Sequence, residues 1–243
     1  MNAVIMNLTA RQLLGKRRTL LMLLFALVPV VVAVIYAFGN DDQHADFTSD
    51  LLESLVITAL LPIVALIFGT GALGSEIEDG TAVYLLGKPI PRWQIVISKL
   101  VVVIGISGAI AALAAVVAGA VAMQGIDEEG LVIGFTVGAI AGAVVYSCLF
   151  LFLSVLTGRA LIAGLLYAFL WEGVVTNIFP GVRLLSVREY SLSIADAIAD
   201  VSPSIFSSEI GVGSAIFGAV VVSVGTTLLA VIRLRAFEIG ETA

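Results

Sequence analysis

Long apolar blocks alternate with short polar segments along most of the chain. Six blocks are each about 20 residues or longer, and Glu172 is the only Asp, Glu, Lys or Arg within them. A helix that rises about 1.5 Å per residue crosses a hydrocarbon core of roughly 30 Å in about 20 residues. Because the blocks are continuous rather than alternating, helices are favoured over a barrel. The predicted spans are Thr19–Phe38, Ser54–Leu73, Leu100–Met123, Leu131–Leu156, Ala160–Phe179 and Val212–Ile232.

Charged residues sort by sign between the segments that connect these spans. Lys and Arg are enriched in the cytoplasmic segments of membrane proteins, so a cytoplasmic N-terminus is favoured. Six spans then place both termini in the cytoplasm and most acidic residues outside. The sequence predicts an all-α membrane protein of the plasma membrane, a six-transmembrane-helix bundle with one domain over residues 1–243. The inner basic residues are Arg11, Lys16, Arg17, Arg18, Lys88, Arg92, Lys99, Arg159, Arg233 and Arg235.

Composition excludes several classes of protein. The chain is 60% hydrophobic and only 12% charged, against about 25% charged in a soluble domain. A net charge of −6 is opposite in sign to the clustered basic excess expected of a nucleic-acid binder, which argues against nucleic acid as a partner. One cysteine and one histidine exclude an intrachain disulfide and a His- or Cys-rich metal site. No P-loop motif occurs, so we expect no cofactor on this chain. Lysine is scarcer than arginine and acids crowd the outer segments, which favours a halophilic source.

The inner segment Gly74–Lys99 has the most informative pattern. An acidic cluster is followed by Gly80, which permits a turn, and by Thr81, which can cap a helix. The short apolar run Ala82–Leu86 then ends at two prolines, and Pro91 suits the first turn of a new helix that enters the third span. The segment is either a solvated connector or a docking helix that transmits force from a soluble partner.

One combination of residues in this segment resembles a known family. The string Glu76-x-Glu78-Asp79-Gly80-Thr81-x-x-Tyr84-Leu85-Leu86-x-x-Pro89-x-x-Arg92-x-x-Ile95-x-x-x-Lys99 is similar to the intracellular loop of ABC-2-type permeases, the membrane subunits of one class of ATP-binding-cassette transporters. Pro91 departs from the small hydroxyl residue that is more common there.

The resemblance implies a non-catalytic permease subunit of an exporter. It implies that a separate ABC ATPase binds ATP and Mg, and that a second permease chain, identical or a sister, completes the pathway among membrane lipids. Met1–Gly15 would be an elbow helix on the inner surface. The short loop helix would be the coupling helix, with candidate residues Glu76, Glu78, Asp79, Gly80, Thr81, Leu85, Leu86, Pro89 and Arg92.

Glu172 is the candidate for a pathway or gate within the spans. A charge in hydrocarbon is costly and marks a functional site by default, and Thr176 and Asn177 lie near it in sequence. A structural glutamate near the outer interface is the other interpretation. An alternative function is an ATPase-independent carrier or channel that uses Glu172 as an ion or proton site. An intramembrane enzyme is disfavoured, because the spans hold neither histidine nor a second carboxylate.

Two further patterns predict packing and an outer helix. Gly130, Gly134, Gly138 and Gly142 recur at every fourth position, so they form a helix-packing stripe, either within the chain or at a moving or dimer surface. In the outer segment Pro180–Gly211, Ser193-x-x-Asp196 resembles a capping box, which predicts a short amphipathic extracellular helix that ends before Pro203. Asp41 to Asp46 are expected to form a flexible acidic loop.

Overall fold

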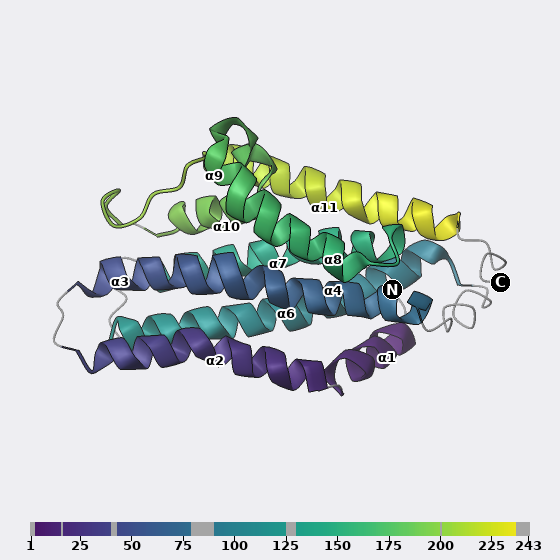
Figure 1. Ribbon diagram of the computed structural model, residues 1–243, viewed down its shortest axis with the longest axis horizontal. Coiled ribbons are helices and arrows are strands. Elements are labelled where there is room, and N and C mark those ends of the chain that lie inside the picture. Colours follow the sequence, from purple (N-terminus) through teal and green to yellow (C-terminus); the bar gives the residue numbers. More distant parts are fainter. Residues whose placement is uncertain are drawn as a thin grey trace.

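The protein folds as an elongated bundle of helices (Figure 1). The computed structural model describes residues 3–15, 17–39, 43–78, 90–124, 130–199 and 201–236. In this part of the chain every regular element is helical, with two π-helical stretches, η1 and η2, and one 3-10 helix, η3. The elements are α1 (Ala3–Leu14), α2 (Arg17–Ala37), α3 (His44–Leu51), η1 (Leu52–Leu60), α4 (Leu61–Glu78), α6 (Arg92–Ala122), α7 (Leu131–Leu156), α8 (Ala160–Leu165), η2 (Leu166–Val175), α9 (Thr176–Ile178), η3 (Pro180–Leu185), α10 (Val187–Asp196) and α11 (Val212–Arg235).

Six helical segments are long and apolar enough to cross a membrane, as predicted. The second begins at His44 rather than Ser54, so His44 and Asp46 of the predicted acidic loop lie in helix α3, and the prediction of a loop was wrong for them. Asp41 and Asp42 lie outside the described residues. The third begins at Arg92, directly after Pro91, which confirms the predicted helix start. The segments are Arg17–Ala37, His44–Gly74, Arg92–Ala122, Leu131–Leu156, Ala160–Ile178 and Val212–Arg235.

Helix α7 lies at the centre of the bundle and packs against α4, α6, α10 and α11. Phe135, Tyr146 and Phe150 of this helix are fully buried. By contrast, α2 and α11 expose most of their large apolar side chains. A bilayer solvates such faces with lipid, so their exposure is the expected pattern for peripheral helices of a membrane bundle.

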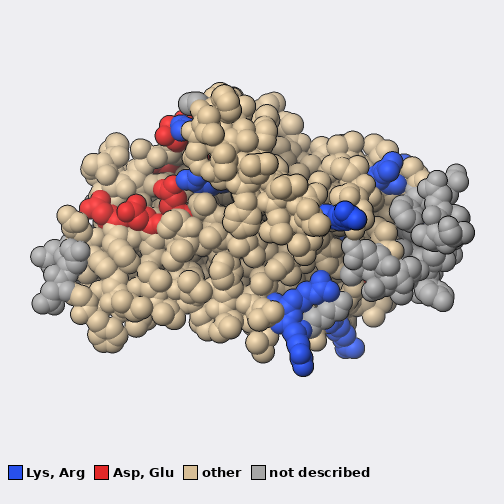
Figure 2. Space-filling model, viewed as in Figure 1, with Lys and Arg blue, Asp and Glu red and all other residues tan. Residues whose placement is uncertain are grey.

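Charge is sorted along the long axis of the bundle. In the face that Figure 2 shows, most Lys and Arg side chains lie toward the end that holds α1 and the last turn of α11, and the visible Asp and Glu side chains lie toward the other end. The first and last helices thus begin and end on the same side, as an even number of spans requires. Assignment of the basic end to the cytoplasm stays a prediction.

The outer helix lies earlier in the chain and is more deeply buried than predicted. It spans Val187–Asp196 and is capped by Ser186, whose side chain accepts a hydrogen bond from the Glu189 backbone N–H at 3.3 Å. The predicted capping box at Ser193 was therefore wrong, since Ser193 lies in the last turn of α10. Its hydroxyl instead donates to the Ile210 carbonyl at 2.8 Å. Most residues of α10 are buried against α7 and α11, so a purely surface position is also wrong.

Candidate functional site

The carboxylate of Glu172 lies in the interior, where four protein donors reach it. Its side chain is 4% exposed. Oε1 accepts hydrogen bonds from the Tyr167 hydroxyl at 3.1 Å and from the backbone N–H groups of Val187 at 2.8 Å and Arg188 at 3.4 Å. Oε2 accepts a hydrogen bond from the Tyr146 hydroxyl. Burying a carboxylate is costly unless it is hydrogen-bonded, and these donors supply the compensation.

Two of these donors are the first backbone N–H groups of α10. The first turn of any helix leaves its N–H groups without intrahelical partners and carries a partial positive charge. Glu172 satisfies two of them from η2, while Tyr146 reaches the same carboxylate from α7. One side chain therefore connects the fifth span, the central helix and the start of α10.

A second acidic residue, Glu53, also contacts the start of α10. The Arg188 guanidinium contacts the Glu53 carboxylate at 2.8 Å, and Glu53 lies in η1 of the second span. Glu53 and Glu172 thus come from the two π-helical stretches of the described chain. Such stretches are rare and recur at functional sites in proteins. Together the two carboxylates fix the start of α10 between the second and fifth spans.

The polar residues predicted beside Glu172 do not join its carboxylate. The Thr176 hydroxyl donates to the Glu172 backbone carbonyl at 2.7 Å, and the Asn177 amide donates to the Gly173 carbonyl at 2.8 Å. Both bonds stay within their own helix. Sequence reasoning missed Tyr146 and Tyr167, although a tyrosine inside an apolar span is a signal, because a buried hydroxyl usually finds a partner.

Glu189, in the first turn of α10, is a buried carboxyl of a different kind. Its side chain is 6% exposed, and within the described chain its Oε2 has no hydrogen-bond partner. Burial raises the pKa of this carboxyl, while the positive charges of Arg188 and Arg183 oppose the rise. The folded protein therefore holds the Glu189 proton more tightly than the unfolded chain does.

Glu189 is expected to make stability depend on pH. The stability that Glu189 contributes is fully present below the ordinary carboxyl pKa of about 4.3. It is lost as pH rises through the raised pKa of this carboxyl in the folded protein. Glu189→Gln should remove this pH dependence of stability. The variant should therefore melt at a higher temperature than the wild type near neutral pH and at a similar temperature in acid. Thermal unfolding across a pH series measures the difference. A variant that melts lower than the wild type at neutral pH would contradict the assignment.

The predicted glycine stripe of α7 faces α10 of the same chain. A Cβ atom on Gly134 would lie 2.6 Å from the Ala195 carbonyl oxygen. A Cβ on Gly138 would overlap the Ser191 carbonyl oxygen, and one on Gly142 would overlap the Ser191 hydroxyl. Small residues allow helix backbones to approach closely in membranes. These three glycines therefore allow α10 to lie close against α7 in this chain.

Gly130, the first glycine of the stripe, has a different role. It precedes α7 as the N-cap residue and has a φ of 66°. Glycine populates this left-handed region without the steric cost that a Cβ atom adds. The Gly130 position thus starts the helix rather than packing along it.

The structure describes the two ends of the predicted coupling segment. Asp79, Gly80, Thr81, Leu85, Leu86 and Pro89 lie outside the described residues. At its start, Glu76 in the last turns of α4 contacts Lys99 of α6, with Nζ and Oε1 2.6 Å apart. The same ammonium group donates to the Ala72 carbonyl at 2.6 Å and is 1% exposed. This buried ion pair, which sequence reasoning missed, ties the second span to the third on either side of the segment. Glu78 ends α4, and Arg92 begins α6.

In the described part of the chain, no group of three His, Cys, Asp or Glu residues could hold a metal ion.

Comparisons with known proteins agree with the six-span helical architecture. No curated protein sequence matches the chain significantly. The sequence model of the family described as ABC-2 family transporter protein matches residues 4–191, which is most of the chain and extends from α1 into α10. The chain therefore belongs to the ABC-2 family of transporter proteins and is a membrane transport permease.

Proposed function

We propose that the chain is the permease subunit of an exporter driven by a separate ABC ATPase chain, which binds ATP and Mg. Two permease chains, identical or sister, enclose the pathway. The basic end of the bundle faces the cytoplasm, with α1 as the elbow helix, because Lys and Arg accumulate on that side of membrane proteins. The residues between Glu76 and Arg92 form the coupling helix that seats in the ATPase.

The buried pair of Lys99 and Glu76 is the observation that carries this proposal. A coupling segment transmits motion only if its two ends move as one unit with the spans that they enter. The pair joins α4 and α6 directly beside the segment at 2.6 Å, in a position that excludes most water. Motion of the ATPase that is transmitted to this segment therefore displaces the second and third spans together.

The contacts of Glu172 favour this function over an ATPase-independent carrier. A carrier site needs a carboxylate that can exchange its partner for an ion or a proton. Both oxygens of Glu172 already accept hydrogen bonds from protein donors. That arrangement supports a structural role for the carboxylate.

Co-purification tests the proposed coupling. The full chain is expressed with an ABC ATPase, which we expect to be encoded beside its gene, and affinity capture of the permease should retain the ATPase. ATP hydrolysis in the reconstituted complex should exceed that of the ATPase alone. A permease that captures no ATPase, or that moves substrate down an ion gradient without one, would refute the proposal.

Breaking the buried pair at one partner should damage both fold and coupling. Glu76→Gln leaves the Lys99 charge buried without its carboxylate, which costs roughly 3 to 5 kcal/mol in fully buried pairs. Because the Glu76 side chain is 20% exposed, we expect a loss toward the lower end of this range. Replacing both partners, as Glu76→Gln with Lys99→Met, should restore much of the melting temperature, because no charge is then left unpaired. Thermal unfolding gives the double-mutant cycle. Additive losses in the double variant would show that the two side chains are not coupled.

A further inference from the structure

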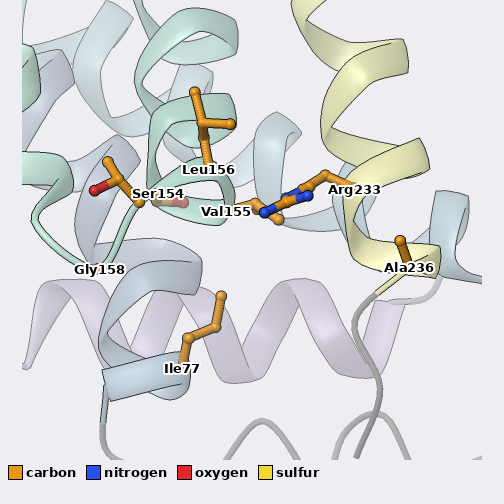
Figure 3. A pocket seen from close by; sticks show the side chains of 8 residues that line it. Ile77, Ser154, Val155, Leu156, Gly158, Arg233 and Ala236 are labelled. Carbon is orange, nitrogen blue, oxygen red and sulfur yellow. The ribbon is translucent and has the colours of Figure 1, made fainter. Parts of the chain in front are cut away.

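A pocket of about 200 Å³ opens at the basic end of the bundle. It lies where the last turn of α4, the turn between α7 and α8, and the last turn of α11 meet (Figure 3). Both α8 and α11 pack on α7, and the pocket lies beside the end of that helix. Its lining residues are Ile77, Ser154, Val155, Leu156, Thr157, Gly158, Arg233 and Ala236.

Arg233 supplies the charge of the pocket. Its side chain extends from α11 across the pocket toward Val155 (Figure 3). Among the described residues it forms no ion pair, and no carboxylate lines the pocket. A guanidinium group presents up to five N–H donors in a planar fork that matches phosphate oxygens. The pocket is therefore a cationic site that no anion of the described chain fills.

The turn on the opposite side adds neutral donors. Thr157 ends α7 with an extended backbone, and its hydroxyl oxygen accepts a hydrogen bond from the Arg159 N–H at 3.2 Å, which leaves the hydroxyl proton free to donate. The Gly158 backbone N–H forms no hydrogen bond with another described residue. The three residues that carry this guanidinium, hydroxyl and backbone N–H thus line one small cavity. This donor set suits an oxyanion with several acceptor oxygens.

Exposed apolar side chains at the pocket and along α11 indicate what kind of molecule contains the oxyanion. Leu156, which lines the pocket, is 46% exposed. On α11, Ile232 and Leu229 precede Arg233 by one and four residues and are 61% and 49% exposed. The pocket thus adjoins an apolar face that is solvated by lipid chains in a membrane. A ligand with a phosphate at one end and acyl chains at the other matches both surfaces.

We propose that this pocket binds the phosphate of an anionic membrane lipid headgroup. The Arg233 guanidinium, the Thr157 hydroxyl and the Gly158 N–H contact the phosphate oxygens, and the acyl chains lie along the exposed face of α11. The bound lipid bridges the end of α4, the α7–α8 turn and α11. Anionic lipids attract basic segments at the cytoplasmic leaflet, where the basic end of this bundle is proposed to lie.

Retention of phosphatidylglycerol by the full chain tests the site, with Arg235 as the matched control. Arg235 lies two residues beyond Arg233 on α11, is exposed and does not line the pocket. Native mass spectrometry of the chain released from phosphatidylglycerol nanodiscs counts the bound lipids. Arg233→Gln should weaken retention roughly tenfold, and Arg235→Gln should change it less than about twofold. Equal retention in the two variants would overturn the proposal.

Two further variants keep the test decisive if Arg233→Gln does not fold. Thr157→Val removes one hydroxyl without changing the shape of the side chain and should weaken retention about fivefold. Arg233→Lys keeps the charge but loses the planar fork, so retention should fall between the wild type and Arg233→Gln. Wild-type retention in both variants would overturn the proposal. Inorganic phosphate is added in a separate series. If it displaces phosphatidylglycerol at comparable concentrations, the site belongs to a free anion and the lipid assignment fails.

Discussion

Glu172→Ala is expected to destabilise the protein by about 3 kcal/mol or more. The change leaves the N–H groups of Val187 and Arg188 and the hydroxyls of Tyr146 and Tyr167 without their acceptor in a buried site. Each buried donor left unsatisfied costs about 1 to 3 kcal/mol, partly recovered where water enters. The start of α10 should loosen first. Thermal unfolding of the purified chain, followed by tryptophan fluorescence, measures the loss.

Glu172→Gln is the conservative partner of this experiment. The amide oxygen can still accept from the α10 N–H groups, but the amide NH₂ cannot accept from a tyrosine hydroxyl. An intermediate loss of about 1 to 2 kcal/mol is expected. A Glu172→Gln variant that unfolds like the wild type yet supports no ATP-driven transport would instead place Glu172 in the substrate pathway.

Gly138→Ala should destabilise the protein by about 1 to 3 kcal/mol, the usual cost of overpacking. The new Cβ atom would overlap the Ser191 carbonyl oxygen and lie 3.1 Å from the Ala195 Cβ. Backbone cannot move aside as a flexible side chain can, so α10 must shift away from α7. The same unfolding measurement, together with proteolysis of the segment that follows α10, detects that shift.

Gly105→Ala is the matched control for the glycine experiment. Gly105 lies in α6, and a Cβ there would meet no atom within 4 Å. Alanine is a better helix former than glycine by about 1 kcal/mol, so this variant should be neutral or more stable. If both alanine variants gained stability alike, the close contact between α7 and α10 would be refuted.

Local sequence patterns were sufficient to predict the spans and several helix ends. The apolar run from Leu131 to Leu156 predicted α7 to the residue, because hydrocarbon admits few polar side chains and a helix satisfies its own backbone. Pro91 marked the start of α6 for an equally local reason, its missing N–H and fixed φ. Such features need no knowledge of the remaining fold.

The outer helix shows where local patterns misled. Ser193 and Asp196 match a capping box, but the actual cap is Ser186, and Asp196 accepts hydrogen bonds from Ser208 instead. The start of α10 is stabilised by Glu172, 15 residues before Val187 in the chain. A motif of four residues cannot include a capping group that comes from another span.

Membrane insertion and the sorting of charge follow from composition along the chain, since each apolar block meets the bilayer independently of the others. The sequence also identified Glu172 as exceptional, because a carboxylate in hydrocarbon is costly wherever it lies. Its partners were decided only when the helices packed, for Tyr146 and the first residues of α10 approach it from other elements. The same holds for Lys99. The sequence placed it at the inner boundary of a span, and the packing of α4 on α6 brought it into an ion pair with Glu76. Burial cost is a property of one residue, whereas its compensation depends on residues that only the folded bundle brings together.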